Sequence, residues 1–459
     1  MQPKLRVSST SLCLLLAPVL FGLSCQPPTA GPTNLSGPGH WILGSNATFR
    51  VEAVSSRSHE WTSGRFGWGD GIGAWRDFAA EESALSDTHA WSSIGAYQVK
   101  AQLRDKNQNL SDWSDSLLIE IDSGPELGSQ LLVGSYPQAL LYNATDDKVY
   151  CANAGGTISV IGSSDSVIAS IPAPGNPYAL TWNQTSDLVY CALAGAREVM
   201  VISGPDDEVR AEIPVGLNPS ALAWNRSSNK VYCANTGDST VTIIDGSDNH
   251  IVATVTVGSA PQALVWNPNT NRVYCANANS DNISVIDGVT DQVVGTKDFI
   301  GRPWALACDT ADNYLLAAGA ASGQVAIFDA ATEALLDTIH VGLQPVGLAV
   351  NYANRTAYSA NQGRTTVAAI SLTGLRLLDT IEVGPNPSAV LWSPAGNLVY
   401  AANAGSDNVA VIDGAANTLI GRFPTGTRPW ALCRNTTRSR VYVANRISGN
   451  VTVLCEKTP

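Results

Sequence analysis

Short apolar segments alternate with polar turns through the larger, C-terminal part of the chain, and one stretch shows the pattern well. We interpret residues 220–224 (SALAW) as strand A and residues 230–235 (KVYCAN) as strand B, with a polar turn between them. Residues 240–244 (TVTII) alternate as strand C, and residues 250–257 (HIVATVTV) follow as strand D. An Asp-Gly pair between strands C and D favours a tight turn. The pattern predicts a small four-stranded sheet.

The same pattern recurs eight times in a nearly fixed phase. Its strand B segment (VYCAN or a variant) begins at Val149, Val189, Val231, Val273, Leu315, Ala357, Val399 and Val441. The first spacing is 40 residues and the six others are 42. A proline precedes each segment: Pro137, Pro177, Pro219, Pro261, Pro303, Pro345, Pro387 and Pro429. Four strands in such a period are typical of one β-propeller blade, so the sequence predicts an all-β protein with a propeller of eight four-stranded blades.

The two ends of the array complement each other. The last copy stops after its strand C at residues 450–455 (NVTVLC), whereas residues 129–133 (SQLLV) read as a strand D that precedes the first copy. We expect these segments to pair, because pairing closes the ring and removes exposed sheet edges. Seven blades remain the alternative, since seven is the commoner number for repeats of this kind.

These repeats resemble the YVTN family of β-propellers, known from archaeal and bacterial surface proteins. The resemblance is carried by the VYCAN segments, by residues 261–267 (PQALVWN) and by the Val-Ile-Asp-Gly runs at Val285 and Val411. It covers residues 129–455, within a predicted propeller domain at 129–459. The resemblance implies the fold, but propellers of this kind serve varied binding roles, so it does not fix the function.

A second unit is predicted at residues 38–122, joined to the propeller by a linker at 123–128. It resembles a PKD-type immunoglobulin-like β-sandwich at three places: residues 65–71 (RFGWGDG), residues 89–91 (HAW) and residues 95–99 (GAYQV). Alternation at residues 97–103 and 117–121 indicates strands. The resemblance implies a stalk or adhesion unit.

The N-terminus has the features of an export signal. Lys4 and Arg6 precede an apolar stretch, residues 12–23, which is short for a membrane span. The stretch ends before Cys25 and resembles a bacterial lipoprotein signal, which implies a signal peptide at 1–24, lipidation of Cys25 and a spacer at 25–37. The alternative is an ordinary secretory signal with an incidental cysteine. We therefore expect an exported cell-envelope or extracellular protein, whose only membrane attachment is a lipid anchor, for instance in the outer membrane.

Composition narrows the classes of partner. The 459 residues are 44% hydrophobic and 14% charged, which is a globular composition, and the net charge is −12. An acidic chain without a basic stripe argues against nucleic acid as a partner.

The residue types that usually carry catalysis or bind metals are poorly arranged for either role. Cys151, Cys191, Cys233 and Cys275 share one position of strand B, too far apart for disulfides, and read as small buried hydrophobes. The five histidines are scattered, and there is no CxxC pair, phosphate-binding loop or nucleophile elbow. We expect no metal, no cofactor and no enzymatic activity.

Two further repeated residues have structural interpretations. The tryptophans of strand A (Trp182, Trp224, Trp266 and Trp392) are expected to pack between blades. The asparagines that end strand B (Asn153, Asn235, Asn277, Asn361, Asn403 and Asn445) are interpreted as turn formers.

The variable positions lie beside the fixed proline. Because strands alternate in direction, the D-to-A loops and the B-to-C turns emerge on one side, where the D-to-A loops surround the channel mouth. Arg302-Pro303-Trp304 recurs as Arg428-Pro429-Trp430, and Arg beside Trp offers a bidentate charge clamp and a stacking plane. Tyr136 and Tyr178 occupy equivalent flanking positions. A carboxylated or sugar-like ligand, or an acidic peptide, would suit these six residues; the alternative is that Arg and Trp only pack on each other.

Three functions follow, in order of preference. The first is a non-catalytic envelope module that binds a protein or glycan through the propeller loops. The second is a lactonase-like propeller hydrolase, which would need carboxylates or histidines converging at the channel mouth. The third is a structural surface-layer component without a discrete ligand.

Overall fold

A computed structural model describes residues 34–36, 40–42, 47–52, 61–78, 84–93, 95–122, 125–299 and 301–456. The predicted signal peptide and Cys25 lie outside these residues. Within them, the only helical element is a 3-10 turn at Ala395–Asn397, and no helix has the length and apolar character needed to cross a bilayer. The described chain is otherwise strands and turns, as the all-β prediction requires.

The repeat region forms eight four-stranded sheets among the described residues, here called blades 1 to 8. The first four blades consist of β10 (Pro137–Asn143), β11 (Lys148–Asn153), β12 (Thr157–Ile161), β13 (Val167–Pro172); β14 (Pro177–Asn183), β15 (Leu188–Leu193), β16 (Glu198–Ser203), β17 (Val209–Pro214); β18 (Pro219–Asn225), β19 (Lys230–Asn235), β20 (Thr240–Asp245), β21 (Ile251–Thr256); β22 (Pro261–Asn267), β23 (Arg272–Asn277), β24 (Asn282–Asp287) and β25 (Val293–Asp298).

The remaining blades repeat the same order. They consist of β26 (Pro303–Asp309), β27 (Tyr314–Gly319), β28 (Gln324–Asp329), β29 (Leu335–His340); β30 (Pro345–Asn351), β31 (Thr356–Asn361), β32 (Thr366–Ser371), β33 (Arg376–Glu382); β34 (Pro387–Ser393), β35 (Leu398–Asn403), β36 (Asn408–Asp413), β37 (Thr418–Pro424); and β38 (Pro429–Asn435), β39 (Arg440–Asn445), β40 (Asn450–Cys455) with β9 (Glu126–Leu132).

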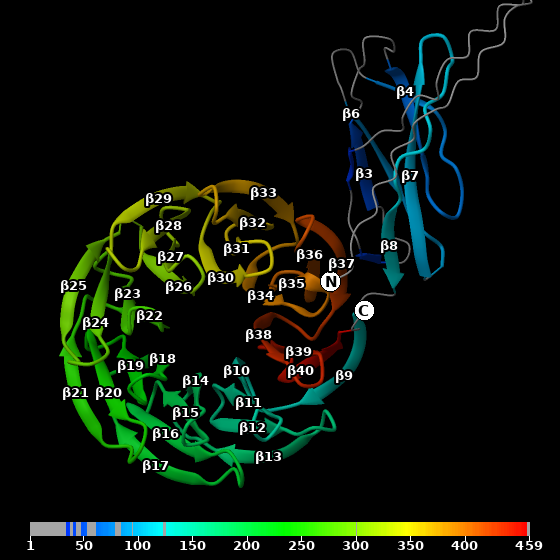
Figure 1. Cartoon of the computed structure of the whole chain (residues 1–459). Coiled ribbons are helices and arrows are strands. Elements are labelled where there is room, and N and C mark those ends of the chain that lie inside the picture. Colours follow the sequence, from blue (N-terminus) through cyan, green and yellow to red (C-terminus); the bar gives the residue numbers. More distant parts are fainter. Residues whose placement is uncertain are drawn as a thin grey trace, which may run out of the picture. The chain divides into compact units, whose positions relative to one another are not determined.

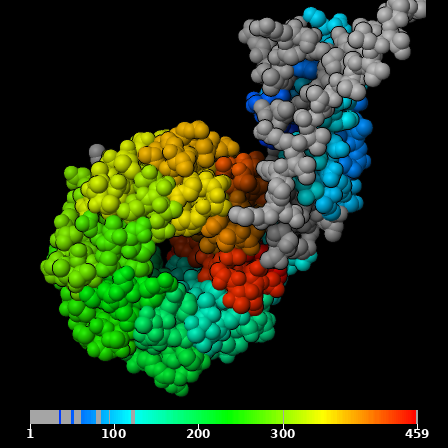
Figure 2. Space-filling model, in the orientation of Figure 1, coloured from blue at the N-terminus to red at the C-terminus, as the bar shows by residue number. Residues whose placement is uncertain are grey.

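The blades are arranged in a closed ring around a central channel. Strand A of each blade contacts strand A of the next, and β38 of blade 8 contacts β10 of blade 1. These A strands lie nearest the ring centre, and the D strands lie at the outside (Figure 1). The space-filling view is hollowed at the same centre (Figure 2). The chain therefore has the predicted β-propeller fold.

The predicted closure of the ring is confirmed. Strand β9 pairs antiparallel with β40, in a register that places Leu131 opposite Val451. Leu131 packs in one core cluster with Tyr442 of blade 8 and Val149 of blade 1. On the side of the A-to-B turns, the Asn435 side chain donates to Asp147 Oδ1 at 2.8 Å. Blade 8 is thus completed by β9, a strand that precedes blade 1 in the sequence. Blade 8 packs on blade 1 in the same way as the other neighbouring blades pack on each other.

The core lies between neighbouring blades and is built mainly from strands B and C. The repeated tyrosine of strand B is fully buried in seven blades, at Tyr150, Tyr190, Tyr232, Tyr274, Tyr358, Tyr400 and Tyr442. In six of these blades the hydroxyl reaches the C-to-D turn of the next blade, as in the bond from Tyr150 to Asp207 Oδ1 at 2.6 Å. A buried hydroxyl needs such a partner, so these six tyrosines fill the interblade core and tie two blades together.

The strand A tryptophans also pack between blades, as predicted. Trp182, Trp224, Trp266 and Trp392 each contact an interblade core cluster. Their indole N–H groups donate to the side chain five residues later in the A-to-B turn, for example from Trp182 to Asp187 Oδ1 at 2.9 Å. These rings are therefore structural, and they do not form an aromatic ligand box.

The asparagines that end strand B have a different role from the one predicted. They are buried in the strand instead of forming the turn. The Asn235 amide donates to Thr240 Oγ1 at 3.0 Å and to Thr242 Oγ1 at 2.9 Å, both on strand C. Asn403 instead reaches the backbone oxygen of Val383 in the preceding D-to-A loop at 2.9 Å. The side chain therefore secures the end of the sheet from inside.

The N-terminal described residues form two further sheets. One has the order β1 (Asn34–Ser36), β3 (Ala47–Glu52), β6 (Ala84–His89), and the other has the order β2 (His40–Ile42), β8 (Leu117–Asp122), β7 (Gly95–Asp105), β4 (Trp61–Gly67), β5 (Arg76–Asp77). In the Trp-Gly-Asp-Gly turn, Trp68 N donates to Gly71 O at 2.7 Å, and Gly69 has a φ of 88°. The glycine is needed for this left-handed conformation. The more specific PKD identification stays a prediction.

Candidate ligand site at the channel mouth

The residue before the fixed proline has an unusual backbone conformation in every blade. Its φ lies between 51° and 62° at Tyr136, Asn176, Asn218, Ala260, Arg302, Gln344, Asn386 and Arg428. Side chains with a Cβ disfavour this left-handed region. The conformation is held by a backbone hydrogen bond, in which the carbonyl of this residue accepts from the residue after strand B, as from Ala320 N to Arg302 O at 3.0 Å. The mouth is thus a rigid backbone frame that carries variable side chains.

Both Arg-Pro-Trp tripeptides line pockets on this frame, and the two pockets adjoin. The first has a volume of about 250 Å³ and is lined by Arg302, Trp304, Ala320, Ala321, Gln344, Val346 and Gln362. The second has a volume of about 460 Å³ and is lined by Gln344, Gln362, Asn386, Ala404, Arg428 and Trp430. Gln344 and Gln362 belong to both. The fold therefore brings four of the six predicted site residues to one continuous part of the mouth, from blade 5 to blade 8.

Within this region each arginine lies over its own tryptophan. The guanidinium carbon of Arg302 is 5.2 Å from the Trp304 ring centroid, and that of Arg428 is 5.7 Å from the Trp430 centroid. The predicted alternative, that the two residues pack on each other, is therefore correct as a description of contact. It does not exclude ligand binding, because the same residues line the pockets.

The two predicted tyrosines are placed elsewhere on the mouth. Tyr136 is 52% exposed before blade 1, and Tyr178 is 37% exposed at the start of blade 2. Neither lines the two pockets described above. They share the repeat frame with the arginine–tryptophan pairs but belong to another part of the ring.

Three residues of this region were not among the predicted site residues: Gln344 is one of the variable residues before the fixed proline, and Gln362 and Arg446 were missed. Arg446 lies over the Trp430 ring at 4.8 Å, so two guanidinium groups flank one indole. Gln344 and Gln362 form the wall that both pockets share. Aligning the residue after the strand B asparagine would have revealed two of them, since that position reads Ala154, Ala194, Thr236, Ala278, Ala320, Gln362, Ala404 and Arg446. The long polar side chains stand out against small ones. We call Arg302, Trp304, Gln344, Gln362, Arg428, Trp430 and Arg446 the mouth site.

The two sides of the propeller carry opposite charge. The D-to-A loops and B-to-C turns form the D–A face, which includes five arginines (Arg197, Arg302, Arg364, Arg428 and Arg446) and three carboxylates (Asp238, Asp281 and Asp407). The A-to-B and C-to-D turns form the A–B face, which includes three arginines and eleven carboxylates. Although the net charge of the chain is negative, the surface around the mouth site carries more arginines than carboxylates.

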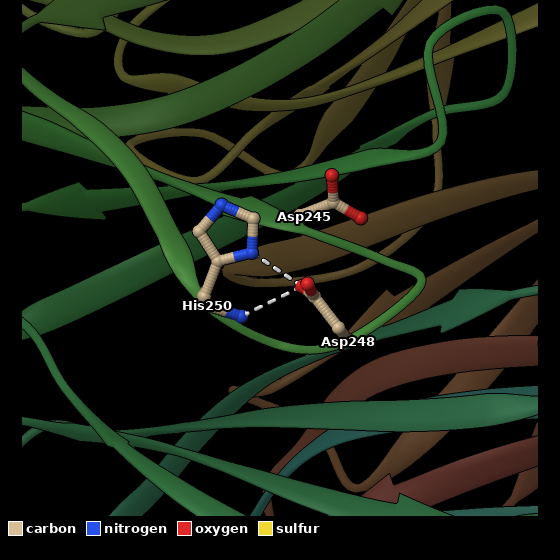
Figure 3. A group of neighbouring side chains, drawn as sticks. All are labelled: Asp245, Asp248 and His250. Atoms are coloured by element: carbon tan, nitrogen blue, oxygen red, sulfur yellow. Dashed lines mark hydrogen bonds and ion pairs between the residues drawn. The ribbon is translucent and has the colours of Figure 1, made fainter.

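Three side chains with metal-ligating atoms lie close together at the C-to-D turn of blade 3, on the A–B face and not on the D–A face that carries the mouth site. Ligand atoms of Asp245, Asp248 and His250 lie within 4.8 Å of one another (Figure 3). His250 precedes β21, one residue short of the strand on which it was predicted. The imidazole ring of His250 is hydrogen-bonded through Nδ1 to the Asp248 carboxylate, and Asp245 Oδ1 accepts a hydrogen bond from Ser247 N at 2.8 Å. Hydrogen bonds within an exposed turn explain the group.

The predicted cysteines are free, and four are fully buried. Cys151, Cys191, Cys233 and Cys275 have no exposed surface, whereas Cys308, Cys433 and Cys455 are partly exposed. Burial raises the pKa of the thiols of the first four well above the ordinary range, and it raises the pKa of Cys433 to about 12. Thiols of this kind do not act as nucleophiles at neutral pH.

Comparison with known proteins supports the fold. No curated protein matches the sequence. Among solved structures, a chain of Kuenenia stuttgartiensis hydrazine synthase is similar, with a TM-score of 0.52 and 19% identity over 62% of this chain and 97% of that chain; a likeness at this identity shows the fold alone. A family model described as a YNCE-like beta-propeller matches residues 213–458, more than half of the sequence, and the chain therefore belongs to the YNCE-like β-propeller family.

Proposed function

We propose that this protein is a non-catalytic binding module of the cell envelope, and that its mouth site holds an anionic ligand. The side chains of the mouth site come from three blades (5, 6 and 8) of a rigid frame, so the site is formed before the ligand arrives. A preformed site loses little conformational entropy on binding.

The observation that carries the proposal is the set of unused polar groups in the mouth site. No described carboxylate lies within salt-bridge distance of the guanidinium groups of Arg302, Arg428 or Arg446. The side-chain amides of Gln344 and Gln362 likewise make no hydrogen bond to any described residue. Five strong hydrogen-bonding groups, of which those of Arg302, Gln344 and Arg428 are exposed to solvent, therefore converge without a hydrogen-bond partner among the described residues. A polar ligand would replace the water around them.

The chemistry of the pockets supports binding over hydrolysis. Their lining residues include no carboxylate, histidine, serine or cysteine. A lactonase-like reaction needs a general base or a bound metal at the reacting carbonyl. The surface-layer alternative needs no discrete site, and it would be supported by self-assembly of the purified protein into arrays.

The experiment measures binding of the fluorescently labelled mature protein to isolated envelope fractions. We expect the triple variant R302A/R428A/R446A to bind at least about tenfold more weakly, because each arginine supplies charge-assisted hydrogen bonds. The matched control is Arg226→Ala. Arg226 also stacks on a tryptophan, 5.9 Å from the Trp224 centroid, but it lies in an A-to-B turn on the opposite face. Equal binding by the triple variant and the wild type would disprove the proposed site.

A further inference from the structure

The side chains of the mouth site define the chemistry of the ligand that would fill it. Guanidinium groups pair with carboxylates in a planar, two-pronged geometry. Indole rings offer a flat apolar surface with one polar N–H, and the amides of Gln344 and Gln362 offer both donors and acceptors. A ligand that uses all three has a carboxylate, an apolar C–H face and several hydroxyl groups on one small unit. A sugar acid has this combination.

At the two arginines the backbone has no free hydrogen-bonding group to offer a peptide. Arg302 N donates to Asp281 Oδ1 at 2.6 Å, and Arg428 N donates to Asp407 Oδ1 at 2.8 Å. The carbonyls of both arginines accept from the following B-to-C turn. Extended peptides gain much of their affinity from main-chain hydrogen bonds. Because these groups are already paired, recognition by side chains is favoured, as for a sugar.

The mouth site contains two copies of the arginine–tryptophan pair. Arg302 with Trp304 and Arg428 with Trp430 stand on the same backbone frame, and the two shared glutamines connect them. At Trp430 a second cation, Arg446, faces the same ring. Two like charges near one indole repel each other, and a bound carboxylate would reduce that repulsion. A ligand with two or more acidic groups along its length fits this duplication better than a single acid.

In two other blades, the side chains at equivalent positions are already hydrogen-bonded within the protein. In blade 3, Ser220 Oγ donates to Pro261 O at 3.1 Å, and Thr236 Oγ1 donates to the same oxygen at 2.6 Å. In blade 7, Ser388 Oγ donates to Pro429 O at 2.9 Å. In these two blades the polar side chains are therefore used by the protein itself, unlike those of the mouth site, and the acidic A–B face would repel an anion from the other end of the channel.

We infer that the mouth site binds an acidic oligosaccharide, whose uronic acid carboxylates pair with Arg302, Arg428 and Arg446 and whose sugar rings lie against Trp304 and Trp430. This inference rests on the proposed function and names the chemical class of its ligand.

The test is titration calorimetry of the mature full-length protein with an oligogalacturonate. The same oligosaccharide with its carboxylates reduced to alcohols is the ligand control, and hexaglutamate and hexathymidylate are competing anions. We expect the oligogalacturonate to bind, its reduced form to bind at least about tenfold more weakly, and rising salt to weaken binding. R302A and R428A should each lower the affinity, whereas R226A should leave it unchanged.

A second variant separates sugar recognition from simple charge. Trp430→Leu keeps all three arginines and removes the stacking surface, so it should weaken oligogalacturonate binding more than binding of any other anion. Circular dichroism establishes that each variant is folded. Failure of the oligogalacturonate to bind, or tighter arginine-dependent binding of hexaglutamate or hexathymidylate, would overturn the acidic-sugar inference. In that case a loss of envelope binding in R302A/R428A/R446A would still support the proposed function.

Discussion

At the residue scale, the same residue type has different roles according to its place in the repeat. Trp224 and Trp266 on strand A are interblade core residues whose indole N–H groups are bonded within their own blade. Trp304 and Trp430 stand directly after the fixed proline and line pockets. Position in the repeat, and not aromatic character, therefore separates a packing residue from a candidate ligand contact.

The buried cysteines give a residue-scale prediction. Burial raises the pKa of the thiols of Cys151, Cys191, Cys233 and Cys275 well above the ordinary range, so their thiolate fraction is very small at pH 8. We expect maleimide labelling of the folded protein at pH 8 to leave Cys151, Cys191, Cys233 and Cys275 unmodified. Peptide mass spectrometry would quantify the labelling site by site.

Labelling of the same protein in guanidinium chloride is the control, since unfolding should make all of these thiols reactive. Rapid modification of Cys151 or Cys233 in the native state would contradict the buried assignment.

At the element scale, the ring is closed by one strand from outside the repeat. Strand β9 supplies the fourth strand of blade 8, and Leu131 inserts between blade 8 and blade 1. Arg438 of blade 8 adds ion pairs at 3.0 Å to Asp147 and to Asp165 of blade 1. The closure thus combines strand pairing, apolar packing and partly buried charge.

Removing β9 should therefore expose an edge and open an interblade core. We expect a chain that begins at residue 134 to melt at least about 5 °C lower than one that begins at residue 125. It should also associate with increasing concentration, because the freed edge of β40 can pair with other chains. Calorimetry and light scattering would measure the two effects.

A synthetic peptide of residues 125–133 provides the control, because it should restore part of the lost stability by pairing with β40. An unchanged melting temperature in the shortened chain would show that β9 contributes little to closure.

At the scale of the whole molecule, the two faces of the propeller differ in charge, and the sequence predicts export. The basic D–A face surrounds the mouth site, whereas the acidic A–B face carries most of the carboxylates of the turns. Such a distribution directs an anionic ligand toward one end of the channel. The predicted lipid at Cys25 would hold the propeller at a membrane.

The anchor gives a prediction at this scale. If Cys25 is lipidated, Cys25→Ser should move the protein from the membrane fraction to the soluble exported fraction, because a lipid chain is then absent. Metabolic labelling with an alkynyl fatty acid, followed by fractionation, checks both points. Membrane association of C25S equal to that of the wild type would contradict the lipoprotein prediction and favour an ordinary secretory signal.

Much of this protein was determined by its sequence alone. The phase of eight VYCAN-like segments and prolines specified the four-strand pattern of each copy, and the missing strand D at residue 455 indicated how the ring closes. Local hydrophobic alternation and turn residues are sufficient for this, because each blade makes its main contacts with its neighbours in the chain. The Arg-Pro-Trp pairs were found by the same comparison of copies.

Only the tertiary structure decided which variable residues act together. Arg302 and Arg428 are 126 residues apart in the sequence, and their pockets adjoin because the ring places blades 5 to 8 around one part of the mouth. Gln362 and Arg446 join them from B-to-C turns, and Tyr136 and Tyr178 do not. The burial of the strand B asparagines was also hidden, since an Asn before a turn has the same local sequence whether its side chain points outward or inward. Such outcomes depend on packing between blades, which no single copy of the repeat encodes.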